Sequence, residues 1–516
     1  MDNLSRIKSG YKSGYKSRHS NTRYGLSRYR LLRYSNKSRN SSKSINQSKR
    51  SLISNYKNNI LNSFIMFGCW NDVDCGSWSN TNWEKNPIYR DIILSKIKKE
   101  KDKLIIILGD NWYPQSYIYN KSKYKYYPFD VLLDGYNKLF SKSKLYDIIL
   151  GNHDEDNDDI INPVKKDCML KTQKYVINKL SNNLNILKLP SLEDLQYTST
   201  SDFYNNNIDF ITAISKPVIK ELNRGIYIIY INTNLFDNYT YILTKYPRSS
   251  DKHITYKKLL AYVSYILKLL KYYNPKLLFV AGHTPLIASK NRKLHKLDNI
   301  YTDPNSLYIM KMLLDNLNKY KTVYLCADVH NFNIALLNNN IATVVSGTGG
   351  AEPDYENIEG KVNYLISPNE ELFNISNHYV YNSFGYTKIK YDKKFNVYVS
   401  YKQIINANKD KKIENKVLYK SVKVYNFLLK NHPDGWEFIK NQDKTSDIKI
   451  KLDIPKLVND KIKMCKKIKS NNDKNITTLN SQIIKSSNKI LKQKYLDNDN
   501  NTALLCYYKR KKIKNK

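Results

Sequence analysis

One pattern recurs six times along the middle of the chain: a short apolar run, as long as a buried strand, ends directly at a polar residue. Runs of this kind, rich in β-branched residues, are typical of strands covered on both faces. Between some of them lie amphipathic stretches, most clearly at 255–273 and 306–320, with apolar residues three and four positions apart. Strands that alternate with helices predict a layered α/β fold with its active site at the carboxyl ends of the strands. The runs are FIMFG before Cys69, KLIIILG before Asp110, LYDIILG before Asn152 and His153, GIYIIYI before Asn232 and Thr233, KLLFVAG before His283, and TVYLCA before Asp328 and His330.

Glycine precedes four of these polar positions, as Gly68, Gly109, Gly151 and Gly282. A glycine lets the chain turn sharply off a sheet and brings the following side chain close to a shared centre. Any α/β protein has single corners of this kind, but their joint occurrence predicts one common site.

Three of the eight histidines fall at these corners, namely His153, His283 and His330. Together with Asp110 and Asn152 they offer imidazole and oxygen ligands. This set suits iron, zinc or manganese better than a structural zinc site made of thiolates alone. The sequence therefore predicts a metal centre.

Charge divides the 516 residues into three parts. Residues 1–58 carry 15 Lys or Arg and one acid, and residues 426–516 carry 22 and 9, within a formal net charge of +40. The apolar runs lie between these two ends. We expect a disordered basic arm over 1–58, a folded domain over 59–425 and a mostly low-complexity tail over 426–516, in which HPDGWEFIK (432–440) suggests a small ordered piece.

Two interpretations of the basic ends stay open. The repeat KSGYKSGYKS (8–17) interleaves Tyr with Lys, which suits phosphate neutralisation and base stacking on nucleic acid. Alternatively, the ends are solvated tails enriched in Lys by the codon usage of an AT-rich genome, such as that of a large DNA virus or a protist. Without a secretory signal or an apolar run of about 18 residues, we expect an intracellular protein outside the membrane, in host cytoplasm or virion if viral.

Five motifs resemble those of calcineurin-like metallophosphoesterases, and most closely those of the small purple acid phosphatases of the tartrate-resistant type. They are GDNWY (109–113), GNHD (151–154), GHTP (282–285), ADVH (327–330) and SGTGG (346–350). The resemblance runs from about Phe64 to about Tyr401 and includes neither basic end. It implies a four-layer α/β/β/α sandwich, in which two mixed sheets are flanked by helices.

The resemblance also implies two metal ions, iron paired with iron, zinc or manganese. Asp110 would bridge them. Tyr113 would be a phenolate ligand of the first ion together with His330, whereas Asn152 and His283 would hold the second ion.

The implied reaction is hydrolysis of a phosphate monoester, in a phosphorylated small molecule or a phosphoprotein, by a hydroxide that the two ions hold. His153 would lie beside the substrate, where it would orient the phosphate or protonate the leaving oxygen. A phosphodiesterase on the same scaffold is a further possibility. The rival from another class is a degenerate phosphoesterase fold that binds nucleic acid or an acidic partner through its basic arms.

Two positions depart from the family pattern. Cys69 stands where the family has an Asp, and a thiolate is softer, which favours zinc or iron over magnesium or manganese. Asp328 stands where the family has a His, and its added negative charge should weaken the Lewis acidity of the ions. Asp72 or Asp74 could reach the first ion instead of Cys69. In a further alternative, Cys69 is a buried apolar thiol and the first site is empty or weak.

Overall fold

The computed structural model describes residues 62–71, 87–113, 128–155, 173, 184–186, 218–236, 250–290, 293–296, 304–351, 353, 359–362, 374–406 and 417–453. They belong to one unit, residues 55–516, and form a mixed α/β structure with two mixed sheets. The predicted arm over 1–58 and the chain after 453 lie outside the described residues. None of the helices in this described part is long and apolar enough to cross a membrane.

The first sheet has nine strands in the order β18-β17-β16-β15-β1-β2-β3-β4, with β19 paired to β17. Strands β1 to β4 are parallel, and the others pair antiparallel. Its strands are β1 (Ser63–Phe67), β2 (Leu104–Leu108), β3 (Leu145–Ile149), β4 (Leu184–Ile186), β15 (Gly385–Tyr391), β16 (Val397–Asn406), β17 (Val417–His432), β18 (Gly435–Lys440) and β19 (Lys444–Asp453).

The second sheet has eight strands in the order β13-β14-β11-β12-β10-β7-β6-β5. Its centre, β6-β7-β10-β12, is parallel. Its strands are β5 (Val218–Asn223), β6 (Ile226–Tyr230), β7 (Leu277–Ala281), β10 (Lys321–Cys326), β11 (Phe332–Leu337), β12 (Ile341–Ser346), β13 (Glu359–Val362) and β14 (Ile375–Tyr381), and a separate hairpin joins β8 (Ile287–Lys290) to β9 (Lys293–Lys296).

Alternate residues of a central strand point into different cores. In β1, Phe64 and Met66 join the core shared with the second sheet, where Phe64 meets Phe279 edge to face at 5.2 Å between ring centroids. Ile65 and Phe67 point the other way, into a core built with helices. Because both faces are covered, β1 is apolar at every position after Ser63 instead of alternating with polar residues.

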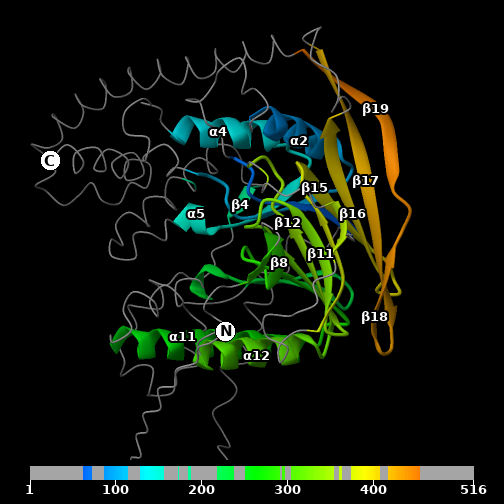
Figure 1. Ribbon diagram of the computed structural model, residues 1–516. Coiled ribbons are helices and arrows are strands. Elements are labelled where there is room, and N and C mark those ends of the chain that lie inside the picture. The colour runs from blue at the N-terminus through cyan, green and yellow to red at the C-terminus, as the bar shows by residue number, and fades with distance from the viewer. Residues whose placement is uncertain are drawn as a thin grey trace, which may run out of the picture. The chain divides into compact units, whose positions relative to one another are not determined.

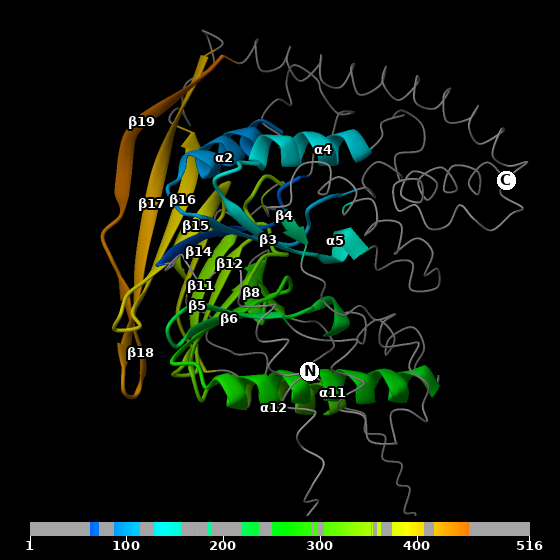
Figure 2. The same ribbon diagram turned by 180° about the vertical axis from the view of Figure 1, so that it is seen from behind.

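Helices pack on the faces of the sheets that point away from the shared core. Helices α2 (Pro87–Lys99) and α4 (Pro128–Leu139) contribute to the core on the first sheet, and α11 (Ser250–Tyr273) and α12 (Pro304–Leu317) to the core on the second. Figure 1 shows the two pairs on opposite sides of the strands, and Figure 2 shows the same separation from behind. The strands expected from the six apolar runs are all present, as are the two expected helices, whereas α2 and α4 were not predicted.

The boundary predicted at residue 425 is wrong, because it falls inside β17 and two more strands follow. The basic composition of the C-terminal part misled here, because residues of β17 such as Tyr425, Phe427 and Leu429 are buried in the core. Trp436 of β18 is also buried, and its indole Nε1 donates to the carbonyl of Asn340 at 2.9 Å. The strands of the segment 426–453 therefore belong to the first sheet. The small ordered piece expected at HPDGWEFIK is present, as the end of β17 and β18.

Candidate metal centre

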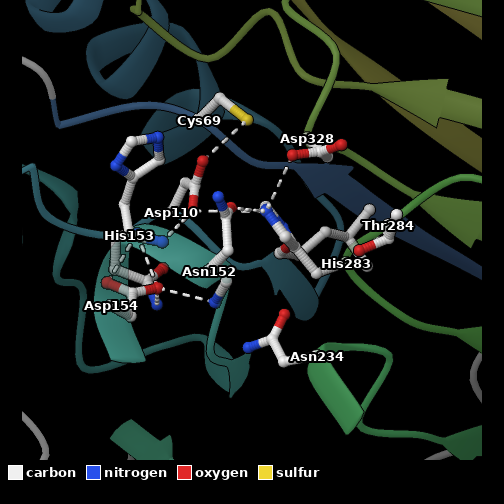
Figure 3. A network of polar contacts seen from close by, with 12 residues as sticks. Cys69, Asp110, Asn152, His153, Asp154, Asn234, His283, Thr284 and Asp328 are labelled. Atoms are coloured by element: carbon white, nitrogen blue, oxygen red, sulfur yellow. Dashed lines mark hydrogen bonds and ion pairs between the residues drawn. The ribbon is translucent and has the colours of Figure 1, made fainter. Parts of the chain in front are cut away.

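The parallel strands of both sheets end at the same place, and their corners bring two groups of potential metal ligands together. One ligand atom from each of Cys69, Asp110 and His330 lies within 4.8 Å of the others, and the same holds for Asp110, His283 and Asp328. Asp110 belongs to both groups. Figure 3 shows the sulfur of Cys69 and the ring of His283 approaching the carboxylate of Asp110 from different sides. These residues could hold a metal.

The two oxygens of Asp110 face different groups. Oδ2 accepts from the thiol of Cys69 at 3.7 Å and from the hydroxyl of Tyr113 at 3.1 Å. Oδ1 accepts from the backbone N–H of His153 at 3.1 Å and lies 3.2 Å from Nε2 of His283. Burial alone would raise the pKa of Asp110, but the neighbouring His283 and His153 lower it to about 2. The carboxylate therefore stays ionised between the two groups.

His283 is oriented as a metal ligand would be. Its Nδ1–H donates to the carbonyl of Leu108 at 2.7 Å, since a carbonyl can only accept, and this leaves Nε2 to face the site. Nε2 lies 3.0 Å from Oδ1 of Asn152, and Asp110 and Asp328 add two carboxylate oxygens, the latter at 3.6 Å. Burial opposes a charge on the ring, but the two carboxylates outweigh it and raise the pKa of His283 well above its usual value. Oxygens converging on an imidazole nitrogen offer the surroundings that a cation requires.

The first group also contains a phenol. The hydroxyl of Tyr113 lies 3.4 Å from Nε2 of His330, and the two rings are nearly perpendicular. The ring of His153 also packs against the phenol, with 4.7 Å between centroids. Tyr113 and Cys69 are buried, whereas His153 and His330 are half-buried. The two histidines therefore border the accessible side of the site.

Three of the candidate ligands have strained backbones. Cys69, Asp110 and Asp328 have φ angles of 50°, 52° and 60°, in the left-handed region that non-glycine residues rarely adopt. Each such residue costs about 1 to 3 kcal/mol and keeps this conformation only where its surroundings enforce it, and such strain concentrates at functional sites. Among the described residues this conformation also occurs outside the site, at Asn274, Asn338, Asn377 and Phe395, so it accompanies the ligand geometry but does not identify the ligands by itself.

The glycines at the corners are required by close packing. A Cβ on Gly151 would lie 2.2 Å from Oδ1 of Asp110, and one on Gly109 would lie 2.6 Å from Nδ1 of His283. The expectation that glycine brings the ligands close to a shared centre is confirmed at these two positions.

Asp154, the last residue of GNHD, was not predicted as a site residue. Its wholly buried carboxylate accepts from the backbone N–H groups of Gly151 and Asn111, at 2.8 and 3.0 Å, and from the amide of Gln173 at 2.9 Å. Burial and then the nearby Asp110 raise the pKa of Asp154 to about 7. Asp154 thus ties the corner after β3, where the four-residue helix α5 (Asn152–Glu155) begins, to the corner after β2. Its position inside GNHD was the only sign of it in the sequence.

The corner after β6 supports the site without providing a ligand. The hydroxyl of Thr233 accepts from the backbone N–H groups of His283 and Thr284, at 3.0 and 2.9 Å, and so fixes the corner after β7. Asn234, which sequence reasoning missed, is wholly buried, and neither atom of its carboxamide has a partner among the described residues. Figure 3 shows this carboxamide extending toward the segment that carries Asn152 and Asp154.

All eight predicted site residues meet at this one place. Cys69, Asp110, His283, Asp328 and His330 form the two groups of potential metal ligands, and Tyr113, Asn152 and His153 contact them. The alternatives Asp72 and Asp74 lie outside the described residues.

No protein-family model matches the chain, and neither does any curated protein. A functional assignment therefore rests on the motifs and on the geometry of the site.

Proposed function

We propose that the protein is a metal-dependent phosphoesterase, similar to the small purple acid phosphatases, that hydrolyses phosphate monoesters. The observation that carries the proposal is the position of Asp110. One of its oxygens faces the thiol of Cys69 and the phenol of Tyr113, while the other faces His283. A carboxylate shared in this way is what a bridge between two cations requires.

The packing of helices and sheets supports the same proposal. Two helices on each sheet and a core between the sheets fit the four-layer α/β/β/α sandwich that the motifs imply. The parallel strands of both sheets then present their carboxyl ends to one site, where ligands bind in open α/β sheets.

Two ions would be held by ligands that the chain already brings together. The first ion would be held by Cys69, Tyr113 and His330, and the second by Asn152, His283 and Asp328. Asp110 would hold both ions. Bound there, the ions would supply Lewis acidity that activates water and neutralises phosphoryl oxygens.

The remaining residues would handle the substrate. The imidazole of His153 is half-buried beside Tyr113, so it would donate a proton to the leaving oxygen or a hydrogen bond to the phosphate. The carboxamide of Asn234 would offer a donor to a phosphoryl oxygen, since it has no partner in the described part of the chain.

Hydrolysis of p-nitrophenyl phosphate tests the proposal. The full-length protein supplied with iron plus zinc or manganese should release p-nitrophenol, and Asp110→Asn should reduce the rate at least about a hundredfold because the shared carboxylate loses its charge. Asp315→Asn makes the same chemical change at an exposed position of α12 and should keep the wild-type rate. Full activity of metal-loaded Asp110→Asn would contradict the proposed bridge, and an inactive wild type would contradict the function.

Asp328 provides an independent test of how the ions act. Its carboxylate, about a fifth exposed, stands 3.6 Å from His283 where the family pattern has an imidazole. Asp328→His removes one negative charge, which should strengthen the Lewis acidity of the ions and move the activity profile to lower pH. An unchanged or upward-shifted profile would mean that this carboxylate does not act on the ions.

A further inference from the structure

The two ligand groups differ in kind, because only the first contains sulfur. The thiol of Cys69 lies with a carboxylate oxygen, a phenol and an imidazole, whereas the group around His283 offers oxygens and one imidazole. Thiolates select soft or borderline ions such as zinc and cadmium, and oxygen ligands also accept manganese and magnesium. The chain therefore surrounds Asp110 with two chemically unequal positions.

The backbone directs Cys69 into the site at an energetic cost. Its φ of 50° is strained for a residue other than glycine, and the cost is about 1 to 3 kcal/mol. Hydrogen bonds hold the strained corner, from the N–H of Cys69 to the carbonyl of Gly109 at 3.1 Å and from the N–H of Ala351 to the carbonyl of Cys69 at 2.8 Å. The corner therefore holds Cys69 where its thiol faces Oδ2 of Asp110.

Cys326 shows how a structural cysteine behaves in the same fold. It is the other free cysteine in the described part of the chain, and its thiol donates to the carbonyl of Val344 at 3.8 Å inside the second sheet. Cys69 instead faces a carboxylate that belongs to both ligand groups. Two equally buried thiols thus have different surroundings, and only that of Cys69 resembles a metal site.

We propose that the position formed by Cys69, Asp110, Tyr113 and His330 is a thiophilic site for zinc-like ions, and that the position around His283 takes the harder ion. When an ion binds at the first position, the thiol of Cys69 would lose its proton to the solvent, and its sulfur would form a bond to the metal. The inference rests on the proposed function for the pairing of the two positions and deepens it by assigning a class of metal to each. It departs from the resemblance, which implies iron with the phenolate of Tyr113 at the first position.

Cadmium is the probe that tests this site, because its bond to a thiolate absorbs in the ultraviolet. The reduced, chelator-treated full-length protein is titrated with Cd²⁺ and the thiolate-to-metal charge-transfer band is followed. The wild type should develop the band, and Cys69→Ser should lose it while binding Zn²⁺ at least about tenfold more weakly. Added Zn²⁺ should displace Cd²⁺ from the site and abolish the band, whereas Mn²⁺ and Mg²⁺ should leave the band unchanged.

Matched variants separate the two positions. Cys326→Ser removes a thiol of equal burial outside the site and should keep the band. His283→Ala should keep the band but lose metal from the second position, because Cys69 does not depend on that ring. Cys69→Asp, which restores the family ligand, should reverse the preference and favour Mn²⁺.

Each result decides for or against the thiophilic site. Three results would overturn it: the band survives in Cys69→Ser, it disappears in Cys326→Ser, or Mn²⁺ at the same concentration as Cd²⁺ abolishes it. The phosphatase assay is read separately. A wild type with the band but without hydrolysis would keep this site and reject the proposed function, whereas hydrolysis without the band would do the reverse.

Discussion

Protonation of a buried histidine should make the fold sensitive to acid. His378, in β14, is only 3% exposed, and its Nε2–H donates to Oδ1 of Asn333 at 2.9 Å. Burial lowers the pKa of His378 from 6.5 to about 4 in the folded chain. Between these values the unfolded state binds more protons, so stability is full above pH 6.5 and is lost as the pH falls toward 4. The loss amounts to about 2 kcal/mol by pH 5 and about 3 kcal/mol below pH 4.

Urea unfolding at pH 7.5 and pH 5 measures this loss. His378→Gln keeps an amide donor for Asn333 but cannot take up a proton, so its free energy of unfolding should fall by about 2 kcal/mol less than that of the wild type. Carboxylates elsewhere titrate equally in both proteins and cancel in the comparison. Equal denaturant slopes would show that the same unfolding reaction is compared. If both proteins lost the same stability between the two pH values, the reasoning would be refuted.

Three further substitutions test the packing that holds the site and the sheets. Gly151→Ala puts a methyl group 2.2 Å from Oδ1 of Asp110. It should weaken Zn²⁺ binding at least about tenfold, measured by competition with a chromophoric chelator. An unchanged affinity would contradict the close packing of Gly151 against Asp110. Arg90→Met removes a wholly buried guanidinium that pairs with carboxylates of α2 and α4, and should cost about 3 kcal/mol in urea unfolding. Lys220→Met leaves the carboxylate of Asp147, which is 3% exposed, without its cation. The free energy of unfolding should fall by a similar amount, which a thermal melt would show as a lower melting temperature. An unchanged melting temperature would mean that the ion pair contributes nothing to stability.

The central strands and the corners of the site could be predicted because burial leaves its pattern in the sequence. A parallel strand covered on both faces is apolar at nearly every position, so runs such as 104–108 stand out, and the polar residue after each run marks the carboxyl end. The outer strands could not be predicted in this way. In β17, buried residues such as Tyr425 and Phe427 are mixed with half-buried and exposed ones, and the chain after it is rich in lysine. The segment therefore resembles a basic tail until its pairing with β16 is known.

Residues that act through other residues also escaped prediction. In the described part of the chain, the side chain of Asp154 forms no hydrogen bond with the side chain of a predicted metal ligand. Its carboxylate instead accepts hydrogen bonds from the backbone N–H groups of Gly151 and Asn111 and so holds the two corners together. Arg90 resembles any helical arginine in sequence, yet its guanidinium donates to Oδ1 of Asn71, two positions after Cys69, at 2.8 Å. Such roles depend on contacts between segments far apart in the chain, which no local pattern encodes.

The strained corners explain why the site should depend on both sheets. The N–H of Gly68, after β1, donates to the carbonyl of Ser346 at the end of β12, and the carbonyl of Gly68 accepts from the N–H of Gly349. These bonds join the first sheet to the second beside Cys69, while Asp110 and His283 meet across the same junction. Because neither sheet alone supplies a complete ligand group, metal binding and the packing of the sheets should stabilise each other. A metal that binds only the folded state would then raise the unfolding temperature of the whole unit, and a chelator would lower it again.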